Sequence, residues 1–266
     1  IRPELLERAT KLRWVACPFA GPPAGYYHQA LIDSGVVVTN TREIYNDHIS
    51  AHIMSFLLAF ARGLHVYIPQ QIEANWRQGY DTIYLPEATA VIVGVGGIGG
   101  ETARLCAEFG MRVIGVDPRL DQAPPGVGEL VRPGGLASAL PQGDFVIATV
   151  PETPETQGMF AESQFKAMKN KAFFINIGRG ATVELDDLVD ALRAGEIAGA
   201  GLDVFQTEPL PATHPLWSIP GVLITPHVAG DGPYLQERRT DLFIDNCVRF
   251  NEGRQLRNVV DKANWF

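Results

Sequence analysis

The chain has 266 residues, of which 46% are hydrophobic and 20% charged, a composition typical of a globular protein with one large or two modest domains. Its formal net charge of −8 argues against nucleic acid as a partner, because an acidic surface repels phosphate backbones. No apolar run approaches the ~20 residues of a membrane helix, no signal peptide is visible, and the three cysteines lack metal-type spacing. We therefore expect a cytoplasmic protein with reduced thiols, no metal site and no membrane partner.

The first part of the chain combines short helices and strands with a loop rich in proline and glycine. Helices are predicted at residues 3–10 and 26–34, and strands at 12–16 and 36–38, on either side of the loop 18–25.

Two apolar helices are predicted next, from Asn46 or Asp47 to Arg62 and over residues 66–76. Both are more apolar than a solvent-facing surface requires. We therefore expect them to be covered by a second copy of the chain in a homodimer.

From residue 88 onward, apolar strands alternate with helices. Strands are predicted at 90–93, 112–116, 145–149, 173–177, 200–204 and 223–225, and helices at 98–109, 161–168, 185–193 and 234–251. Fully apolar strands that alternate with helices indicate a parallel sheet covered on both faces. The predicted fold class is therefore α/β, with a doubly wound parallel sheet of the Rossmann type.

The first of these strands runs directly into a glycine-rich turn that opens a helix. This turn reads Gly94-Val95-Gly96-Gly97-Ile98-Gly99, which fits the pattern GxGxxG. In that pattern the first glycine permits a tight turn, the second lets the backbone approach a pyrophosphate, and the third lets the helix pack on the sheet. The free N–H groups of the helix N-terminus can then bind the phosphates, so the turn predicts a dinucleotide site.

An acidic residue follows at the spacing expected for the ribose of the dinucleotide. Asp117 ends the next strand, 18 residues after Gly99, and a carboxylate there can accept both ribose hydroxyl groups of NAD. It would repel the 2′-phosphate of NADP, whereas the nearby Arg119 could accommodate that phosphate. We predict NAD (NADH) as the cofactor over NADP.

Three charged residues with complementary chemistry each follow a predicted strand. Arg179, Glu208 and His227 should meet at the carboxyl edge of the sheet, where ligands bind in such folds. Arginine binds a carboxylate through a bidentate fork, histidine exchanges protons near neutral pH, and a neighbouring carboxylate orients the imidazole. Reduction of a 2-oxo acid needs this set together with a hydride donor.

The chain resembles the D-isomer-specific 2-hydroxyacid dehydrogenases over nearly its whole length. The motifs that carry the resemblance are VTNT at 38–41, LLAFAR at 57–62, GVGGIG at 94–99, VPETPET at 150–156, NIGRG at 176–180, GLDVFQTEP at 201–209, HPLW at 214–217 and TPHVAG at 225–230. The resemblance implies that Arg179 binds substrate, that His227 is the acid/base, and that Glu208 is its partner. It further implies pairing of subunits through the two apolar helices.

The resemblance also assigns binding residues. Backbone amides near Ala20 and Gly21 would hold the substrate carboxylate, and Asp203 would contact the nicotinamide amide. The expected cofactor-binding set is Gly94, Gly96, Gly97, Ile98, Gly99, Asp117, Pro151, Thr156, Ile177, Gly178, Asp203 and Gly230. Two departures bear on the substrate: the loop at 17–23 resembles the substrate loop of the family but has extra prolines, and Glu152 stands where the family usually has an apolar residue.

The expected domain organisation follows from the same comparison. Residues 1–44 would begin a smaller, N-terminally truncated, flavodoxin-like substrate domain, 45–230 would form the NAD-binding domain with the dimerisation helices, and 231–266 would return to the substrate domain. The predicted function is NAD-dependent reduction of a small 2-oxo acid to the D-2-hydroxy acid, and the reverse. Two alternatives are an NAD(H)-sensing, corepressor-like binding protein and an inactive truncated form of the dehydrogenase. A formate-dehydrogenase-like enzyme is disfavoured, because that subgroup carries glutamine in place of Glu208.

Overall fold

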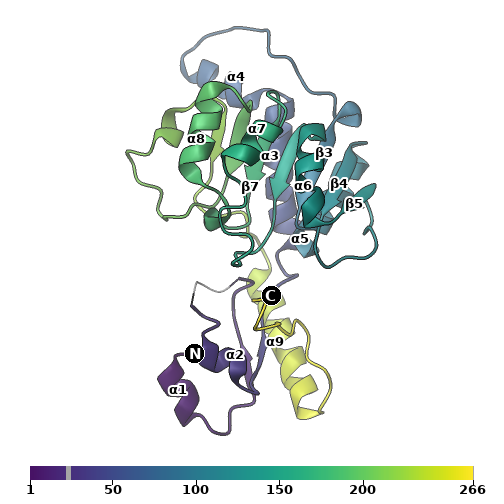
Figure 1. The fold of residues 1–266 in the computed structure, drawn as a ribbon, viewed down its shortest axis with the longest axis vertical. Helices are drawn as coiled ribbons and strands as arrows, with labels where there is room; N and C mark the ends of the chain where they lie inside the picture. The colour runs from purple at the N-terminus through teal and green to yellow at the C-terminus, as the bar shows by residue number, and fades with distance from the viewer. Residues whose placement is uncertain (22–24, 266) are drawn as a thin grey trace. The chain divides into compact units, whose positions relative to one another are not determined.

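The structure of the protein, a computed structural model, describes residues 1–21 and 25–265. It divides into two compact units (Figure 1). Unit 1 comprises Ile1–Asn46 and Asp231–Phe266, and unit 2 comprises Asp47–Gly230.

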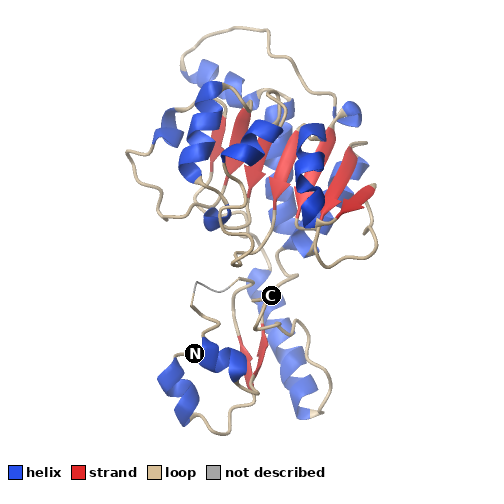
Figure 2. Ribbon diagram, in the orientation of Figure 1, coloured by secondary structure: helices blue, strands red, loops and turns tan. Residues whose placement is uncertain are grey.

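Unit 2 is built on a seven-stranded parallel sheet, which confirms the predicted doubly wound α/β fold (Figure 2). The strands are β3 (Thr89–Val93), β4 (Arg112–Val116), β5 (Glu129–Val131), β6 (Phe145–Ala148), β7 (Phe173–Asn176), β8 (Gly199–Leu202) and β9 (Val222–Ile224). Their spatial order is β5-β4-β3-β6-β7-β8-β9, so the chain direction across the sheet reverses between β3 and β6. Ligands of such sheets bind at this switch point, outside the carboxyl ends of the strands.

Helices cover both faces of this sheet (Figures 1 and 2). The helices of unit 2 are α3 (Asn46–Ala61), α4 (Leu64–Ile72), α5 (Gly97–Glu108), α6 (Leu136–Ala139), α7 (Glu162–Ala167) and α8 (Leu185–Ala194). Short 3-10 helices lie at Leu85–Glu87, Pro133–Gly135, Leu140–Gln142, Gly180–Thr182 and Pro215–Ser218.

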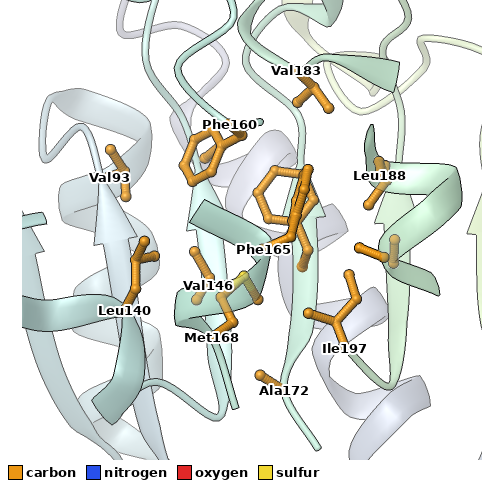
Figure 3. Packing of buried hydrophobic residues seen from close by; sticks show 14 of the residues in the cluster. Val93, Leu140, Val146, Phe160, Phe165, Met168, Ala172, Val183, Leu188 and Ile197 are labelled. Atoms are coloured by element: carbon orange, nitrogen blue, oxygen red, sulfur yellow. The ribbon is translucent and has the colours of Figure 1, made fainter. Parts of the chain in front are cut away.

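Two hydrophobic clusters lie on the two faces of the sheet, because fully buried strands present apolar side chains in both directions. One cluster joins strand residues such as Val93 and Val146 to Phe165 of α7 and Leu188 of α8 (Figure 3). The other joins α3 and α5 to the opposite side chains of the same strands and includes the fully buried Phe60. Together they fix the carboxyl edge on which the candidate site is built.

Unit 1 has a smaller core around two strands. It contains α1 (Pro3–Arg8), β1 (Trp14–Ala16), α2 (Gln29–Asp33), β2 (Val37–Thr39) and α9 (Leu235–Asn251), and β1 pairs with β2 in parallel. Its buried apolar residues are Cys17, Tyr27, Leu31, Val36, Val38 and Val260. The end of the chain belongs to this core, because the N–H of Val260 donates to the carbonyl of Val38 at 2.8 Å.

Several elements differ from the sequence-based prediction. The helices predicted at 3–10 and 26–34 and the strand predicted at 12–16 are shorter, and α6 was not predicted. The helix predicted at 66–76 ends at Ile72, because Ala74 adopts a left-handed φ of 51° and the N–H groups of Ala74 and Asn75 close the helix on Gln71 and Gln70. Strand β5 was not predicted, since it is only three residues long and includes the exposed Glu129. It pairs with β4 at the edge of the sheet.

Among the described residues, no single helix has the length and apolar character needed to cross a membrane. The pair α3 and α4 meets that test only when joined, and it is bent by 73°.

Candidate functional site

The glycine turn after β3 has room for a ligand only because of its glycines. Gly94 has a φ of 93°, and a Cβ on Gly99 would lie 1.9 Å from the carbonyl oxygen of Gly94, so neither position tolerates another residue. Gly96 and Gly97 are exposed at the start of α5, and no side chain caps that helix. Its first N–H groups are therefore suited to the pyrophosphate of a dinucleotide cofactor.

Asp117 lies directly beside this turn but is turned inward. Its side chain is 1% exposed, its Oδ2 accepts a hydrogen bond from the N–H of Val95 at 2.9 Å, and its Oδ1 accepts one from the N–H of Arg119 at 2.9 Å. The carboxylate therefore joins the end of β4 to the glycine turn.

A second loop at the switch point follows β6, the strand next to β3. Thr156 Oγ1 donates to the carbonyl of Pro151 at 2.7 Å and accepts from the N–H of Thr153 at 2.8 Å, so the loop is folded on itself. Gly178 packs against it, since a Cβ there would lie 2.6 Å from the carbonyl oxygen of Val150. Ile177 beside it is buried. The expected cofactor-binding residues of these two loops thus lie close together.

His227 and Glu208 form a direct pair. His227 Nδ1 lies 2.7 Å from Glu208 Oε2, while Glu208 Oε1 accepts the N–H of Phe205 at 2.9 Å. The two side chains are 49% and 34% exposed, so both are open to solvent. Because Nδ1 faces the carboxylate, the ring nitrogen left for proton exchange with a substrate is Nε2.

Arg179 belongs to a loop that packs on the segment before Glu208. A Cβ on Gly180 would lie 1.9 Å from the carbonyl carbon of Phe205, so only glycine allows this approach. The Arg179 guanidinium donates to the carbonyl of Gly178 at 2.7 Å. Burial lowers the pKa of Arg179, and the charges of Glu152 and Glu208 act in the opposite direction. Arginine stays protonated at working pH, so a cation is held near two carboxylates.

Asp203 holds the loop that carries His227. It is buried, its Oδ1 accepts the Thr225 hydroxyl at 2.6 Å and the N–H of Val228 at 2.9 Å, and its Oδ2 accepts the N–H of Ala229 at 2.9 Å. These contacts flank His227, which has a left-handed φ of 55°. The expected contact between Asp203 and the nicotinamide stays a prediction.

The sequence interpretation did not include the residues that complete this network. The hydroxyl of Thr225 donates its one hydrogen bond to Asp203. The Thr225 oxygen also lies 3.0 Å from His52 Nε2, so it accepts a hydrogen bond from that ring nitrogen. Two signals were present in the sequence: Thr225 stands in the same motif as His227, and His52 interrupts the apolar run of α3.

The residues expected to hold the substrate carboxylate lie in unit 1. The carbonyl of Ala20 accepts a hydrogen bond from Asn40 Nδ2 at 2.9 Å, and the carbonyl of Pro18 accepts one from Thr41 Oγ1 at 3.1 Å. These bonds tie the start of the loop, with Gly21, to the end of β2. Residues 22–24 of the same loop lie outside the described residues. Gly230 is the last residue of unit 2.

Among the described residues, no group of three or more His, Cys, Asp or Glu side chains is arranged so that it could hold a metal ion. Cys17 and Cys106 are buried free thiols, and Cys247 is exposed.

Comparisons with known proteins identify similar sequences and structures. Residues 54–229 match the family described as D-isomer specific 2-hydroxyacid dehydrogenase, NAD binding domain. Glyoxylate reductase from Korarchaeum cryptofilum is 34% identical over 97% of this chain and 79% of its own length.

Two solved structures are similar as well. A D-isomer specific 2-hydroxyacid dehydrogenase from Xanthobacter autotrophicus Py2, in complex with NADPH and MES, has a TM-score of 0.90 at 28% identity and covers 100% of this chain and 82% of its own. An NADPH-dependent glyoxylate/hydroxypyruvate reductase from Sinorhizobium meliloti, in complex with NADP and sulfate, has a TM-score of 0.85 at 29% identity, with coverages of 100% and 84%.

Proposed function

Since the chain belongs to the D-isomer specific 2-hydroxyacid dehydrogenases, we propose that it reduces a small 2-oxo acid to the D-2-hydroxy acid, and catalyses the reverse. The observation that carries the proposal is the His227–Glu208 pair with Arg179 in electrostatic range. Relatives named glyoxylate reductase make glyoxylate and hydroxypyruvate the first substrates to test.

The proposed roles follow from the geometry of these three side chains. In the reducing direction, His227 Nε2 donates a proton to the oxygen that forms from the substrate carbonyl. Glu208 accepts the Nδ1 proton of His227, which fixes the ring orientation and stabilises the imidazolium before transfer. Arg179 binds the substrate carboxylate and polarises the adjacent carbonyl.

We propose NAD(H) as the preferred cofactor, which supplies the hydride when bound. The glycine turn, the uncapped N-terminus of α5 and the acidic residue at the end of β4 support a dinucleotide there. Pro151, Thr156, Ile177, Gly178 and Gly230 would line the nicotinamide end. Because two similar structures contain NADPH or NADP, the test is the ratio of kcat/KM for NADH and NADPH, and a higher value for NADPH would overturn the preference.

The decisive experiment is NADH oxidation by the purified chain with glyoxylate, hydroxypyruvate, pyruvate and phenylpyruvate. Turnover with at least one of them is the expected result, with formation of the D-isomer from hydroxypyruvate, pyruvate or phenylpyruvate, whose products are chiral. Binding of NADH without turnover of any oxo acid would instead favour a cofactor-sensing protein and would overturn the proposed activity.

We further propose a homodimer that covers α4 and the segment after it. Ile72 and Trp76 are 82% and 92% exposed, which is unusual for side chains of this size and polarity. A second copy of the chain is the proposed occupant of this face. Light scattering should give twice the 29.0 kDa mass of the chain, and Trp76→Asp should shift the protein toward the monomer. A monomer mass at micromolar concentration would contradict the proposal.

We also propose that the protein is cytoplasmic, which its three free cysteines and acidic composition support.

A further inference from the structure

A second histidine is held close to the loop that carries His227, on helix α3. Gly201 of β8 has no side chain, and a Cβ there would lie 2.8 Å from Phe56 Cγ, so the ring of Phe56 packs directly on the strand. His52 lies one turn earlier on the same face of α3. Its ring is nearly perpendicular to that of Phe56, with the centroids 4.8 Å apart. Close packing of α3 on β8 therefore places His52 beside the end of that strand.

Hydrogen bonds connect His52 to the backbone on both sides of His227. His52 Nε2 lies 3.0 Å from Thr225 Oγ1, and the Thr225 hydroxyl donates to Asp203 Oδ1 at 2.6 Å. Asp203 also accepts the two backbone N–H groups that follow His227, each at 2.9 Å. His227 itself has a left-handed φ of 55°, a conformation that persists only where its surroundings enforce it.

The direction of these hydrogen bonds is determined at Asp203. A carboxylate only accepts, so the Thr225 hydroxyl gives its single proton to Asp203 and can only accept from His52. Without the Nε2 proton of His52, that hydroxyl can rotate toward another acceptor, and Asp203 then loses one of its donors. His52 Nε2 also lies 3.8 Å from Asp203 Oδ1, so a polarised N–H is close to a buried negative charge.

We propose that His52 is a positioning residue for proton transfer, which acts through Thr225 and Asp203 to hold His227 in its reactive orientation. The inference rests on the proposed function, in which His227 is the acid/base. Substrate binding is assigned there to Arg179, on a different loop. Loss of the His52 donor should therefore lower kcat and leave KM for the oxo acid nearly unchanged.

His52→Phe tests this role, because it keeps a ring against Phe56 and removes the Nε2 proton. With NADH and the oxo acid that the wild type reduces fastest, kcat should fall roughly 3- to 10-fold, the range of one net hydrogen bond, while KM changes by less than about twofold. His52→Gln keeps an N–H donor and should restore kcat to within about twofold of the wild type. Melting curves check that each variant is folded at the assay temperature. His52→Leu, which also lacks a donor, replaces His52→Phe if that variant does not fold.

A double substitution separates action through Thr225 from packing alone. Thr225→Val removes the acceptor of His52 and should lower kcat by itself. If His52 acts through Thr225, the addition of His52→Phe should lower kcat by less than about twofold further. A loss that came only from packing against Phe56 would instead multiply the loss in Thr225→Val.

His65 of α4 provides the matched control. It also packs against phenylalanine rings, at centroid distances of 5.2 Å from Phe60 and 5.6 Å from Phe173. His65→Phe makes the same chemical exchange in another ring cluster, so kcat and KM at neutral pH should equal those of the wild type.

Three results would overturn the inference while the proposed function stands. They are a kcat of His52→Phe equal to that of the wild type, a kcat of His52→Gln as low as that of His52→Phe, and independent losses in the double variant. Absence of turnover by the wild type with every oxo acid would overturn the proposed function, and the role of His52 with it.

Discussion

The carboxylates of unit 2 fall into two groups that differ in burial. Asp117 and Asp203 are each 1% exposed, and each accepts backbone N–H groups of a neighbouring loop. Glu208 is 34% exposed and uses one oxygen for the backbone and the other for His227. The buried acids therefore hold loops, whereas the exposed acid is placed to influence a reacting group. Substitutions of each kind should separate stability from turnover.

The largest effect is expected at the exposed pair. His227→Ala removes the proposed proton donor, and turnover should fall by roughly 10²- to 10⁴-fold. Dissociation of NADH should change little, since no hydrogen bond between His227 and the glycine turn is present in the described part of the chain. Steady-state kinetics and titration of the same protein preparation provide the measurement. Turnover within tenfold of wild type would remove His227 from the mechanism.

A smaller, mixed effect is expected at the buried acid beneath that loop. Asp203→Asn directs an NH₂ group at hydrogen-bond donors, because Asp203 accepts from Thr225, Val228 and Ala229. An unsatisfied buried donor costs roughly 1–3 kcal/mol, so the free energy of unfolding should fall by that amount and turnover should fall with it.

A control identifies which role of Asp203 dominates. Thr225→Val removes one donor and leaves both backbone N–H groups paired, so its loss of stability should be smaller than that of Asp203→Asn. If Asp203→Asn instead weakened NADH binding and left the unfolding free energy unchanged, the contact with the nicotinamide amide would be the main role of Asp203.

The sequence alone predicted most strands of the large sheet and the place of the candidate site. Strands β3, β4, β6 and β7 were predicted because their residues are almost all apolar, and a short apolar run between two helices is typical of a buried parallel strand. The meeting of Arg179, Glu208 and His227 was predicted from their places after parallel strands, and the structure brings His227 and Glu208 into contact.

Other features depend on side-chain direction or on distant partners, which periodicity does not encode. The position of Asp117 at the end of β4 was predictable, but its inward rotamer was not. His52 and Thr225 are 173 residues apart in sequence, so their contact depends on the packing of α3 against the sheet. Strand β5 is short and contributes little apolar area, so its place is decided by pairing with β4.

A few-fold effect is expected at Glu152, an acid in the loop after β6. The charge of Glu152 acts on Arg179, where the substrate carboxylate is proposed to bind. Glu152→Gln removes that competing charge, so KM for glyoxylate should fall by roughly two- to fivefold, the range of partly exposed ion pairs, with kcat nearly unchanged. Glu155→Gln, an exposed acid on the same loop, should leave KM unchanged. A rise in KM for Glu152→Gln would mean that Glu152 assists substrate binding.

The smallest effect is expected where burial acts on a group outside the site. His65 of α4 lies among the rings of Phe60, Tyr80 and Phe173, with centroid distances of 5.1–5.6 Å. Its Nδ1 is buried and has no hydrogen-bond partner in the described part of the chain. Burial lowers the pKa of His65 below its ordinary 6.5, and the carbonyl of Ala59 acts in the opposite direction.

The sign of the resulting pH dependence follows from proton binding. Below about pH 6.5 the unfolded chain protonates this histidine while the folded chain resists, so the contribution of His65 to stability is complete above pH 6.5 and is lost as pH falls through the lowered folded-state pKa. His65→Phe keeps the aromatic packing and removes the titrating group. The fall in Tm between about pH 7.5 and about pH 5.5 should therefore be smaller in His65→Phe than in the wild type, by roughly 1–3 °C. The chain has six histidines and the other five are common to both proteins, so their titration cancels in the comparison. Parallel Tm curves would show that His65 titrates alike in the folded and unfolded chains, and the ring cluster would then be a packing feature without a role in acid sensitivity.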